Sequence, residues 1–535
     1  MNHAREFFWK ALQRTGLVKR RKHHFQVTID SFKERLNTFP GKPRQESSGG
    51  GGVGVLILPW LQTAVPLYSL ECARQFAARG EKVTLIWDET SLFNSASNAW
   101  EVSLLEDLVL RLRDEFAVVE PSNEVPSWEK EPAFFEELLT ENAVQACRGE
   151  GGVQAWLAER PELRAQLRAH VERVADLFRR HRFDWLFVPG GVWAISGVYN
   201  AVAQEQGLRT VTFDSGPGSL FIASNGIAAH FPDVTATAQT VIESTETDGN
   251  LPAHVEIEAR EKLDERMRGD DEYRLQPIAA SASPGGKGWD ILVPLNLRWD
   301  SAALCRRRLF SSVEDWLSQL LAWLEKHPDV TLAIRQHPCE KLPAFRGTDD
   351  FRELLTRFPQ LGQRATFISA EEQVNTYDLI HAAKVVLPFT SRVGIEATML
   401  GRPVILGTEC YYKDCGFTWN PASALEYFAA LSEALAGNLK VTEDSRRRAC
   451  ITYYLAECCL ELRTRFTPAP VDYSQWVKMS PAEIWASPEN EDLLTALIDH
   501  DPLVAIRYRR LAMSNAANGT GQRHGSRTVL EQTQI

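Results

Sequence analysis

The sequence contains no continuous run of about 18 apolar residues, so we expect no membrane-spanning helix. Its first residues also lack the apolar stretch that is typical of a signal peptide. The nine cysteines include no Cys-x-x-Cys pair, and Cys458 and Cys459 are adjacent, which favours neither a zinc site nor a disulfide framework. These absences predict a cytoplasmic protein whose cysteines are free, buried thiols.

An excess of basic residues is absent as well. Lys and Arg number 59 against 70 Asp and Glu, which gives a formal net charge of −11. Because a general nucleic-acid binder needs surplus positive charge to neutralise phosphates, we expect no nucleic-acid partner. The 44% hydrophobic and 24% charged residues are typical of a packed globular protein, and 535 residues predict three domains or two large ones. We expect a large soluble enzyme.

The first 48 residues form a basic extension that differs from this acidic average. Arg5, Lys10, Arg14 and the basic run at 19–22 alternate with the apolar side chains of Phe7, Phe8, Trp9, Leu12, Leu17 and Val18. A basic helix over residues 5–24 has two interpretations, which both stay open. It lies on the anionic inner face of the cytoplasmic membrane, as a peripheral contact, or it packs on the protein body with its charges in water.

The following residues alternate between strand and helix patterns. Residues 53–88 contain an apolar strand, a helical stretch, a glycine and a second buried strand, which together make a βαβ unit with parallel strands. A long helical region at 101–182 follows, and the strand–helix–strand pattern returns at 184–214. We predict a first Rossmann-like domain over residues 49–270 with a helical insertion.

After a Gly/Ser/Pro-rich loop at 281–288 the same alternation restarts. The expected strands are 290–294, 330–335, 384–389 and 403–406, and the expected helices are 311–326, 377–383 and 393–400. We predict a second Rossmann-like domain over 288–440, helices over 441–513 and a disordered tail over 514–535. The fold class is therefore α/β, with two doubly wound domains that face a cleft.

In such sheets ligands bind at the carboxyl ends of the strands, so the residues that follow each strand are the candidates for chemistry. Asp214 ends a strand and enters the loop Ser215-Gly216, the position of a general base that faces the cleft. A turn-forming aspartate is the alternative. Asn225 and His230 follow closely and, with Gly216, are expected to line the same cleft on its acceptor side.

Two polar stretches of the second domain resemble phosphate sites. His337 precedes Pro338, which ends the strand, so a charged His337 can hydrogen-bond a leaving phosphate; a histidine that only caps the sheet edge is the alternative. Thr390 and Ser391 lie between a strand and a helix, where helix N–H groups bind anions.

Further residues of the second domain are candidates for binding the donor. Gly394 allows close backbone approach, and Glu396 is a candidate to accept hydrogen bonds from a ribose diol or to complete a capping box. Asn296 and Asp300 are placed to position a sugar or a base, although a turn uses the same residues.

Two Rossmann-like halves with these motifs resemble a GT-B glycosyltransferase. Residues 290–420 resemble the bacterial capsule polysaccharide biosynthesis family, which includes the Kdo transferases of capsule export. Related bacterial sialyl- and polysialyltransferases share an acidic-acidic-Gly motif, a His-Pro motif and a Ser-Ser/Thr motif. The stretches that carry the resemblance are 293–296 with Asp300, 335–338, 377–380, 390–397 and 401–405. This chain departs from the motifs at Ser215, which replaces the second acidic residue, at Thr390-Ser391, and at Asn296, where the Kdo enzymes have Gln.

The resemblance implies a metal-independent transferase without a cofactor. Its donor is a nucleotide sugar, for example a CMP-linked one, and its acceptor is a surface or capsular polysaccharide or a glycolipid. Asp214 is then the general base and His337 the partner of the leaving phosphate, while Arg335, Thr390 and Ser391 bind the donor phosphates. A nucleotide-sugar epimerase on the same fold and a non-catalytic scaffold of polysaccharide assembly are the alternatives, and the missing second acidic residue keeps the scaffold open.

Overall fold

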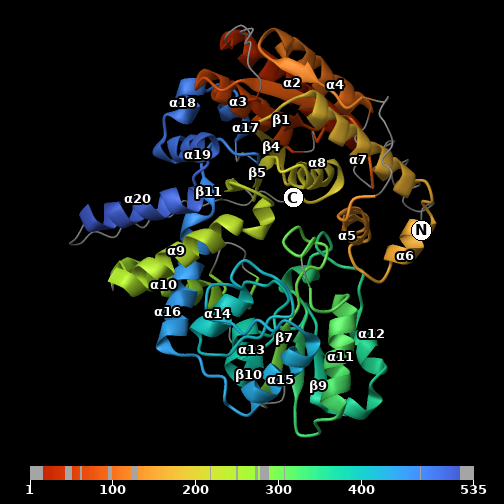
Figure 1. The fold of residues 1–535 in the computed structure, drawn as a ribbon, viewed down its shortest axis with the longest axis vertical. Coiled ribbons are helices and arrows are strands. Elements are labelled where there is room, and N and C mark those ends of the chain that lie inside the picture. Colours follow the sequence, from red (N-terminus) through yellow and green to blue (C-terminus); the bar gives the residue numbers. More distant parts are fainter. Residues whose placement is uncertain are drawn as a thin grey trace.

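The protein folds into two α/β domains, one above the other in Figure 1. The computed structural model describes residues 16–41, 51–60, 63–93, 99–122, 131–216, 218–248, 251–270, 275–277, 288–306, 308–469 and 472–517. One sheet has seven strands in the order β11-β6-β5-β4-β1-β2-β3, and the other has four in the order β10-β7-β8-β9. The predicted α/β class with two largely parallel, helix-flanked sheets is therefore confirmed.

The first sheet forms because short apolar strands are buried on both faces. All five residues of β1 are buried, and β1 pairs in parallel with β2 and β4. β6 and β11 run antiparallel at one edge, which the sequence pattern did not predict. The strands are β1 (Val53–Ile57), β2 (Val83–Trp87), β3 (Ala117–Val119), β4 (Trp185–Pro189), β5 (Arg209–Asp214), β6 (Ser219–Ala223) and β11 (Leu462–Arg463).

The helices of this domain include the predicted insertion. They are α3 (Val65–Ala78), α4 (Ala99–Arg111), η1 (Leu112–Asp114), α5 (Phe135–Cys147), α6 (Val153–Ala158), α7 (Leu163–Arg180), α8 (Ala194–Glu205) and η2 (Ala228–His230). The region at 101–182 is not helical throughout, because β3 interrupts it and joins the sheet edge beside β2.

The second sheet is parallel throughout. Its strands are β7 (Trp289–Pro294), β8 (Leu332–Arg335), β9 (Ala365–Ile368) and β10 (Ala383–Val386). The predicted strand at 403–406 makes only isolated bridges, Val386 with Val404 and Ile405 with Trp419. The surrounding helices are α11 (Val313–Glu325), η4 (Pro338–Lys341), α12 (Phe351–Thr356), η5 (Pro359–Arg364), α13 (Thr376–Ala382), α14 (Val393–Met399) and α15 (Ala424–Leu435).

The packing of the helices moves the domain boundary away from residue 270. α9 (Pro232–Asp248) and α10 (Ala253–Met267), which the sequence pattern assigns to the first domain, bury Val234, Val255 and Leu263 in one cluster with Leu292 of β7. The chain therefore enters the second domain soon after η2.

The C-terminal helices connect both domains. α16 (Glu443–Tyr454) contacts α9, α10 and α14 and continues as a π-helical turn at Leu455–Cys459. α17 (Tyr473–Trp476), α18 (Pro481–Trp485) and α19 (Pro488–Asp499) then pack on the first domain, where Trp476 and Leu493 join its core (Figure 1). α20 (Leu503–Ala517) extends past Ser514, so the first residues of the predicted disordered tail are helical.

The N-terminal extension contains one long helix, α2 (Gly16–Thr38). Ile29, Phe32 and Leu36 are buried in the core of the first domain, and the buried Arg35 guanidinium pairs with Glu71 at 3.1 Å. This half of α2 packs on the protein body. The predicted membrane contact spans residues 5–24. Residues 5–15 lie outside the described part of the chain, and of the side chains at 16–24 only that of His23 is described.

Two further expectations from the sequence concern the state of the cysteines and the presence of membrane-spanning helices. All nine cysteines are free, and each is at least partly buried. Among the described helices, none is long and apolar enough to cross a membrane.

Candidate functional site

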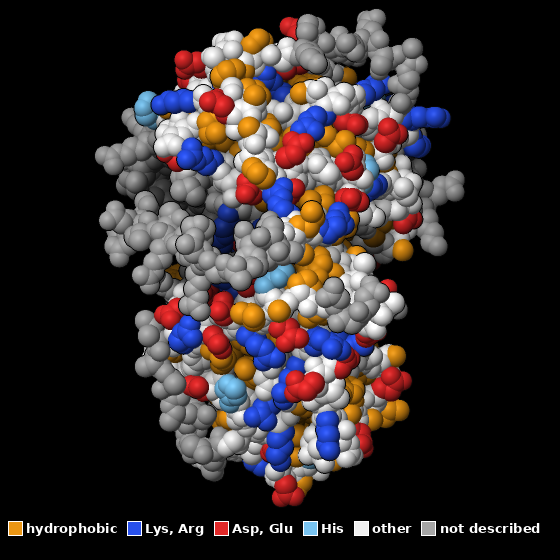
Figure 2. Space-filling view, turned by 90° about the vertical axis from the view of Figure 1, so that its left-hand side faces the viewer, with side chains coloured by type: hydrophobic (Ala, Val, Ile, Leu, Met, Phe, Trp, Pro, Cys, Tyr) orange, Lys and Arg blue, Asp and Glu red, His pale blue; other side chains and the backbone are white. Residues whose placement is uncertain are grey.

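Polar residues at the carboxyl ends of strands from both sheets meet between the two domains. Asp214 ends β5 in the first domain, whereas Asp300 follows β7 and His337 follows β8 in the second. Asp214 and Asp300 lie close enough for their charges to interact, although they come from different domains. Figure 2 shows the surface hollowed between the upper and lower parts of the molecule. The strand ends of the two domains therefore bring these polar residues toward the same region of the molecule.

The Asp214 carboxyl is held in a partly desolvated environment. Burial raises its pKa to about 6, the Ser215 backbone N–H opposes this shift by donating to Oδ1 at 2.8 Å, and the Asp300 charge adds to it. A carboxyl with a pKa near neutrality takes up and releases a proton readily at physiological pH. The Asp214 carboxyl can therefore exchange a proton near neutral pH.

Asp300 is the acidic neighbour that the local sequence around Asp214 lacks. Its carboxyl accepts hydrogen bonds from the backbone N–H groups of Ala302 and Ser301, while burial raises its pKa. Its charge also acts on Cys339, which follows His337. Where the motif of the related transferases has a second acidic residue in the first domain, this chain has Ser215 there and a carboxyl from the second domain close to Asp214.

His337 caps the η4 turn through its ring. The Cys339 backbone N–H donates to Nδ1 at 3.2 Å, so the proton of the neutral ring lies on Nε2. Burial and the nearby Arg335 charge lower the pKa of His337 to about 4. The ring is therefore neutral near pH 7, contrary to the predicted positive charge. In the described part of the chain no group accepts from Nε2, which leaves that N–H for a ligand.

Asn296 and Thr390 lie together, because they follow the neighbouring strands β7 and β10. The Asn296 amide donates to Thr390 Oγ1 at 2.9 Å and accepts from the Thr390 N–H at 3.1 Å. Ser391 Oγ accepts from the Val393 N–H at 3.3 Å at the start of α14. This pairing fixes the loops after β7 and β10 relative to each other.

Two side chains predicted to bind the donor, Glu396 and Arg335, are engaged by the protein itself. Glu396 is buried and accepts from Arg266 at 3.1 Å and from Tyr377 at 3.0 Å, so it holds these side chains rather than a ribose. The buried Arg335 guanidinium donates to the carbonyl oxygens of Ser369 and Val374 and thereby supports the loop after β9 rather than a phosphate.

Gly394 allows a close approach, but of a side chain. A Cβ at this position would lie 2.2 Å from the Tyr412 hydroxyl, which donates to the Ser391 carbonyl at 2.6 Å. Tyr412 therefore occupies the space that a side chain at position 394 would need.

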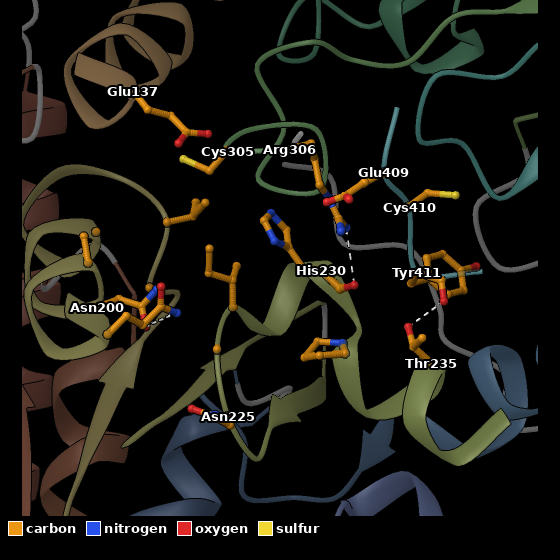
Figure 3. A pocket seen from close by; sticks show the side chains of 18 of the residues that line it. Glu137, Asn200, Asn225, His230, Thr235, Cys305, Arg306, Glu409, Cys410 and Tyr411 are labelled. Atoms are coloured by element: carbon orange, nitrogen blue, oxygen red, sulfur yellow. Dashed lines mark hydrogen bonds between the residues drawn. The ribbon is translucent and has the colours of Figure 1, made fainter. Parts of the chain in front are cut away.

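A pocket of about 610 Å³ lies between the domains and contains two other predicted residues, Asn225 and His230 (Figure 3). α5, α8 and α9 contribute to its wall together with the loops at 305–306 and 409–414. His230 Nε2 lies 2.9 Å from the Leu304 carbonyl oxygen, and burial together with the Arg306 charge lowers the pKa of His230 to about 3. Gly216 is not in this wall; its carbonyl accepts from the Ser219 N–H in the turn after Asp214.

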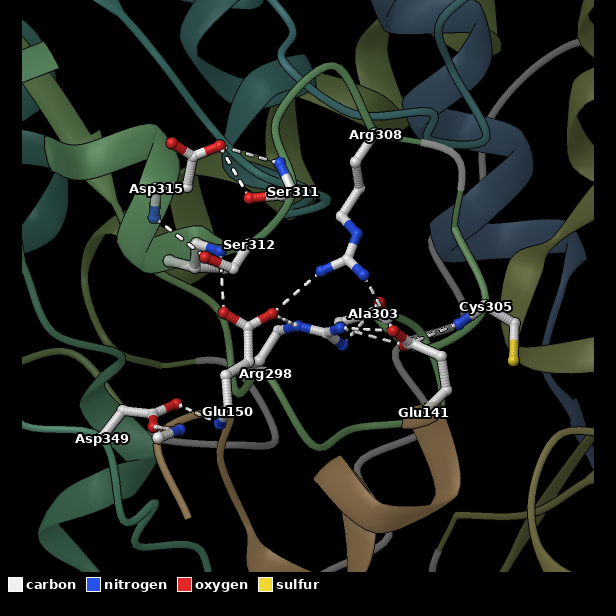
Figure 4. Close-up of polar contacts among 12 residues, drawn as sticks. Glu141, Glu150, Arg298, Ala303, Cys305, Arg308, Ser311, Ser312, Asp315 and Asp349 are labelled. Carbon is white, nitrogen blue, oxygen red and sulfur yellow. Dashed lines mark hydrogen bonds and ion pairs between the residues drawn. The ribbon is translucent and has the colours of Figure 1, made fainter. Parts of the chain in front are cut away.

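The helical insertion holds the second domain through a buried ion-pair network (Figure 4). Arg298 pairs with Glu141 of α5 at 2.8 Å and with Glu150 at 2.5 Å, and Arg308 pairs with both carboxylates at 2.9 Å. Glu150 also accepts from the Val313 N–H at the start of α11. The loop between β7 and α11, which carries Asp300, is thus tied to the first domain.

The sequence patterns missed the charged residues that only the pocket brings together. Arg306 lies within the basic run at 306–308, Glu409 follows the apolar stretch at 403–406, and Glu137 lies on α5. The one sequence signal that pointed to any of these residues is the basic run at 306–308, which follows a polar loop. Within the described part of the chain, no three His, Cys, Asp or Glu side chains are grouped so that they could hold a metal ion.

The topology defines the GT-B architecture, in which two Rossmann-like domains face each other with their strand ends between them. Residues 271–434 match the model of the family described as "Capsule polysaccharide biosynthesis protein". This confirms the resemblance read from the motifs of the second domain.

Similar solved structures share little sequence with this chain. The β-Kdo 2,4-transferase of Thermosulfurimonas dismutans KpsC is 16% identical over 50% of this chain and 79% of its own, with a TM-score of 0.31. A glycosyltransferase from Rickettsia africae is 10% identical over 84% and 99%, with a TM-score of 0.26. The UDP-GlcNAc 2-epimerase from Neisseria meningitidis is 11% identical over 80% and 98%, with a TM-score of 0.23. No curated protein sequence matches the chain.

Proposed function

We propose that this protein is a glycosyltransferase that moves a sugar from a nucleotide-sugar donor to a surface or capsular polysaccharide or a glycolipid. The observation that carries the proposal is the Asp214 carboxyl of the first domain, whose pKa is about 6, close to Asp300 of the second domain. The match of residues 271–434 to a capsule polysaccharide family supports the same substrate class.

In the proposed reaction the acceptor hydroxyl oxygen attacks the anomeric carbon of the donor sugar. Asp214 accepts the hydroxyl proton, a new glycosidic C–O bond forms, and the bond between the anomeric carbon and the phosphate oxygen breaks. The nucleotide leaves with the bonding electron pair. A carboxyl poised near neutral pH suits this role, because it is ionised before attack and readily takes up a proton.

His337 is proposed to stabilise the leaving phosphate. Its neutral ring presents an Nε2–H donor, since Nδ1 accepts from Cys339. A bound phosphate would raise the pKa of this histidine and favour the charged form, so donor binding itself would strengthen the interaction. Thr390, Ser391 and Asn296 then line the donor side of the cleft, with no metal ion or cofactor required.

The acceptor is proposed to bind the first domain. If the basic segment at 5–24 contacts an anionic membrane, it would hold the enzyme near lipid-linked acceptors on the inner face of that membrane. The packing of α2 on the first domain through Phe32 would place that segment at a fixed point of the body.

The test is transfer of labelled sugar from CMP-, UDP- and GDP-linked donors to a lipid and polysaccharide extract of encapsulated bacteria. Asp214→Asn should reduce transfer by about 10²–10⁴-fold, the usual contribution of a general base. Asp329→Asn, at an exposed carboxyl far along the chain, is the matched control and should transfer normally.

Two outcomes would replace the proposal. Conversion of the nucleotide sugar without any acceptor would establish the epimerase. Transfer by Asp214→Asn at the wild-type rate would show that Asp214 is not the general base and only forms a turn.

A further inference from the structure

Glu457 lies on the segment that crosses from the second domain to the first. It is part of the π-helical turn Leu455–Cys459, which continues α16 and is followed by β11. β11 pairs with β6, where Phe221 is the register partner of Asp214. π-helical turns are rare, and those that occur within helices are frequent at functional sites. The crossing segment therefore connects the helices of the second domain with the strand pair that carries Asp214.

The Glu457 carboxylate pairs with two arginines of the second domain. It accepts from Arg392, which follows Ser391 in the loop before α14, and from Nη2 of Arg266 on α10 at 3.2 Å. Its side chain is 11% exposed, so both pairs lie largely out of water. Among the described residues, Glu457 is the carboxylate that pairs with Arg392. Charge-assisted hydrogen bonds thus tie the loop before α14 to the crossing segment.

Arg266 extends this contact into a cluster of balanced charge. Its Nη1 donates to Glu396 at 3.1 Å, and Glu396 also accepts from the Tyr377 hydroxyl at 3.0 Å. Two guanidinium groups therefore face two carboxylates. Burial disfavours the charged form of Arg392, but the Glu457 charge outweighs burial and raises the pKa of Arg392. Without the Glu457 charge, Arg392 would be a partly buried cation that has lost its counter-charge, which is costly.

The loop itself is shaped by hydrogen bonds to Ser391. The Val393 N–H donates to Ser391 Oγ at 3.3 Å. The Ser391 carbonyl accepts from the Gly394 N–H at 3.1 Å and from the Tyr412 hydroxyl at 2.6 Å. Arg392 is the next residue in this turn, and its guanidinium is anchored on Glu457. The position of the Ser391 hydroxyl therefore depends on where the Arg392 side chain is held.

We propose that Glu457 is a positioning residue for the loop at 390–392 and that it acts through Arg392. The inference rests on the proposed function, because this loop is taken to bind the donor phosphates. Since the crossing segment continues into the β11–β6 pair, the same contact holds the donor loop in a fixed place relative to Asp214. Glu457 lies outside residues 271–434, so the family match does not include it.

The first measurement is hydrogen–deuterium exchange of the full-length protein without ligand. In Glu457→Gln the amides of Val393 and Gly394 should exchange about tenfold faster than in the wild type, the usual effect of losing a hydrogen bond between charged groups. The amides of β1 should exchange as in the wild type, which excludes global destabilisation. Glu443→Gln, which removes an exposed pair with Arg446 on α16, is the matched control and should exchange like the wild type.

The second measurement is sugar transfer with the CMP-, UDP- or GDP-linked donor that the wild type uses. Glu457→Gln should raise the KM for the donor about tenfold, for the same lost bond, and leave the KM for the acceptor unchanged. A variant that only lowers the fraction of folded enzyme would lower kcat and leave both KM values in place. In an Arg392→Met background the substitution should have no further effect on the donor KM, because the contact is already lost.

Arg392→Met also covers the case in which Glu457→Gln does not fold. It removes the same contact from the side of the loop and leaves Glu457 paired with Arg266. It should accelerate exchange of the same two amides and raise the donor KM. Wild-type exchange of these amides in both variants, an unchanged donor KM, or additive effects of the two substitutions would overturn the inference.

The exchange measurement needs no nucleotide sugar, so failure of the inference is distinguishable from failure of the proposed function. Faster exchange in Glu457→Gln without any transfer by the wild type would support the positioning role and refute the reaction. Transfer by Glu457→Gln with the donor KM of the wild type would refute the positioning role alone.

Discussion

Asn296 and Thr390 hold each other through two hydrogen bonds that join the loops after the neighbouring strands β7 and β10. The amide donates to the hydroxyl at 2.9 Å and accepts from the backbone N–H at 3.1 Å. Both residues are candidates for donor binding, and each keeps further hydrogen-bonding capacity. Their mutual contact fixes these two loops relative to each other.

Asn296→Ala should lower the stability of the second domain, because it removes both of these bonds. The expected loss is about 1–3 kcal/mol at the usual net worth of about 0.5–1.5 kcal/mol per bond. Urea unfolding followed by tryptophan fluorescence measures it. Asn438→Ala, which removes an exposed contact with Glu433, should change stability by less than about 0.5 kcal/mol. Equal losses in the two variants would contradict the role of the pair.

The pH dependence of transfer should follow the ionisation of Asp214. Because its pKa is about 6, the rate should rise through a midpoint near pH 6 and then level off. An Asp300→Asn variant removes the acidic neighbour, so its midpoint should move to lower pH. Initial rates from pH 4.5 to 8 measure both profiles. An equal midpoint in the variant and the wild type would show that the Asp300 charge does not affect the pKa of Asp214.

The free energy of unfolding should also depend on the ionisation of Asp214. It should fall as the pH rises, whereas the transfer rate should rise. The pKa of Asp214 is raised on folding, so its contribution is most favourable below about pH 4 and is lost as the pH rises through 6. Asp214→Asn should therefore be more stable than the wild type at pH 7 by up to a few kcal/mol, at about 1.4 kcal/mol per pKa unit. The difference should shrink between pH 6 and pH 4; urea unfolding at each pH tests this, and a constant difference would contradict it.

Arg298→Met should destabilise the protein strongly, because it leaves Glu141 and Glu150 with one arginine between them. Arg298 and Glu141 are 4% and 3% exposed, and breaking a buried pair costs about 3–5 kcal/mol. Arg357→Met breaks an exposed pair with Glu314 and should cost at most about 1 kcal/mol. Thermal and urea unfolding of the two variants measure the contrast. Similar small losses would show that the network contributes little to joining the domains.

Gly394→Ala should be destabilising because the added Cβ meets the Tyr412 hydroxyl at 2.2 Å. The expected cost is about 1–3 kcal/mol for overpacking. Tyr412→Phe removes the obstructing oxygen, so the double variant should lose less stability than the sum of the two single variants. Gly151→Ala is the control, since its Cβ would meet Asp349 only at 3.4 Å. Additive losses would show that the two residues do not compete for this space.

The alternation of apolar strands and amphipathic helices determined the fold class and most of the elements. β1, β4 and β7 are short apolar runs whose strand character is local. β6, β9 and β11 were not predicted, because a strand at a sheet edge or between loops depends on the neighbour with which it pairs. The 403–406 stretch is apolar like a strand, but its pairing stops at isolated bridges.

The sequence by itself also selected the cleft residues, since polar groups after buried strands must lie at one edge of a parallel sheet. It singled out Asp214, His337, Asn296 and Thr390 by this rule. Only the tertiary structure decided their environments: burial beside Arg335 makes His337 neutral, and Arg266 and Tyr377 occupy Glu396. Burial and contacts between distant parts of the chain, such as that between Arg266 and Glu396, are not encoded by any local pattern. For that reason the proximity of Asp300 to Asp214 became visible only in the folded chain.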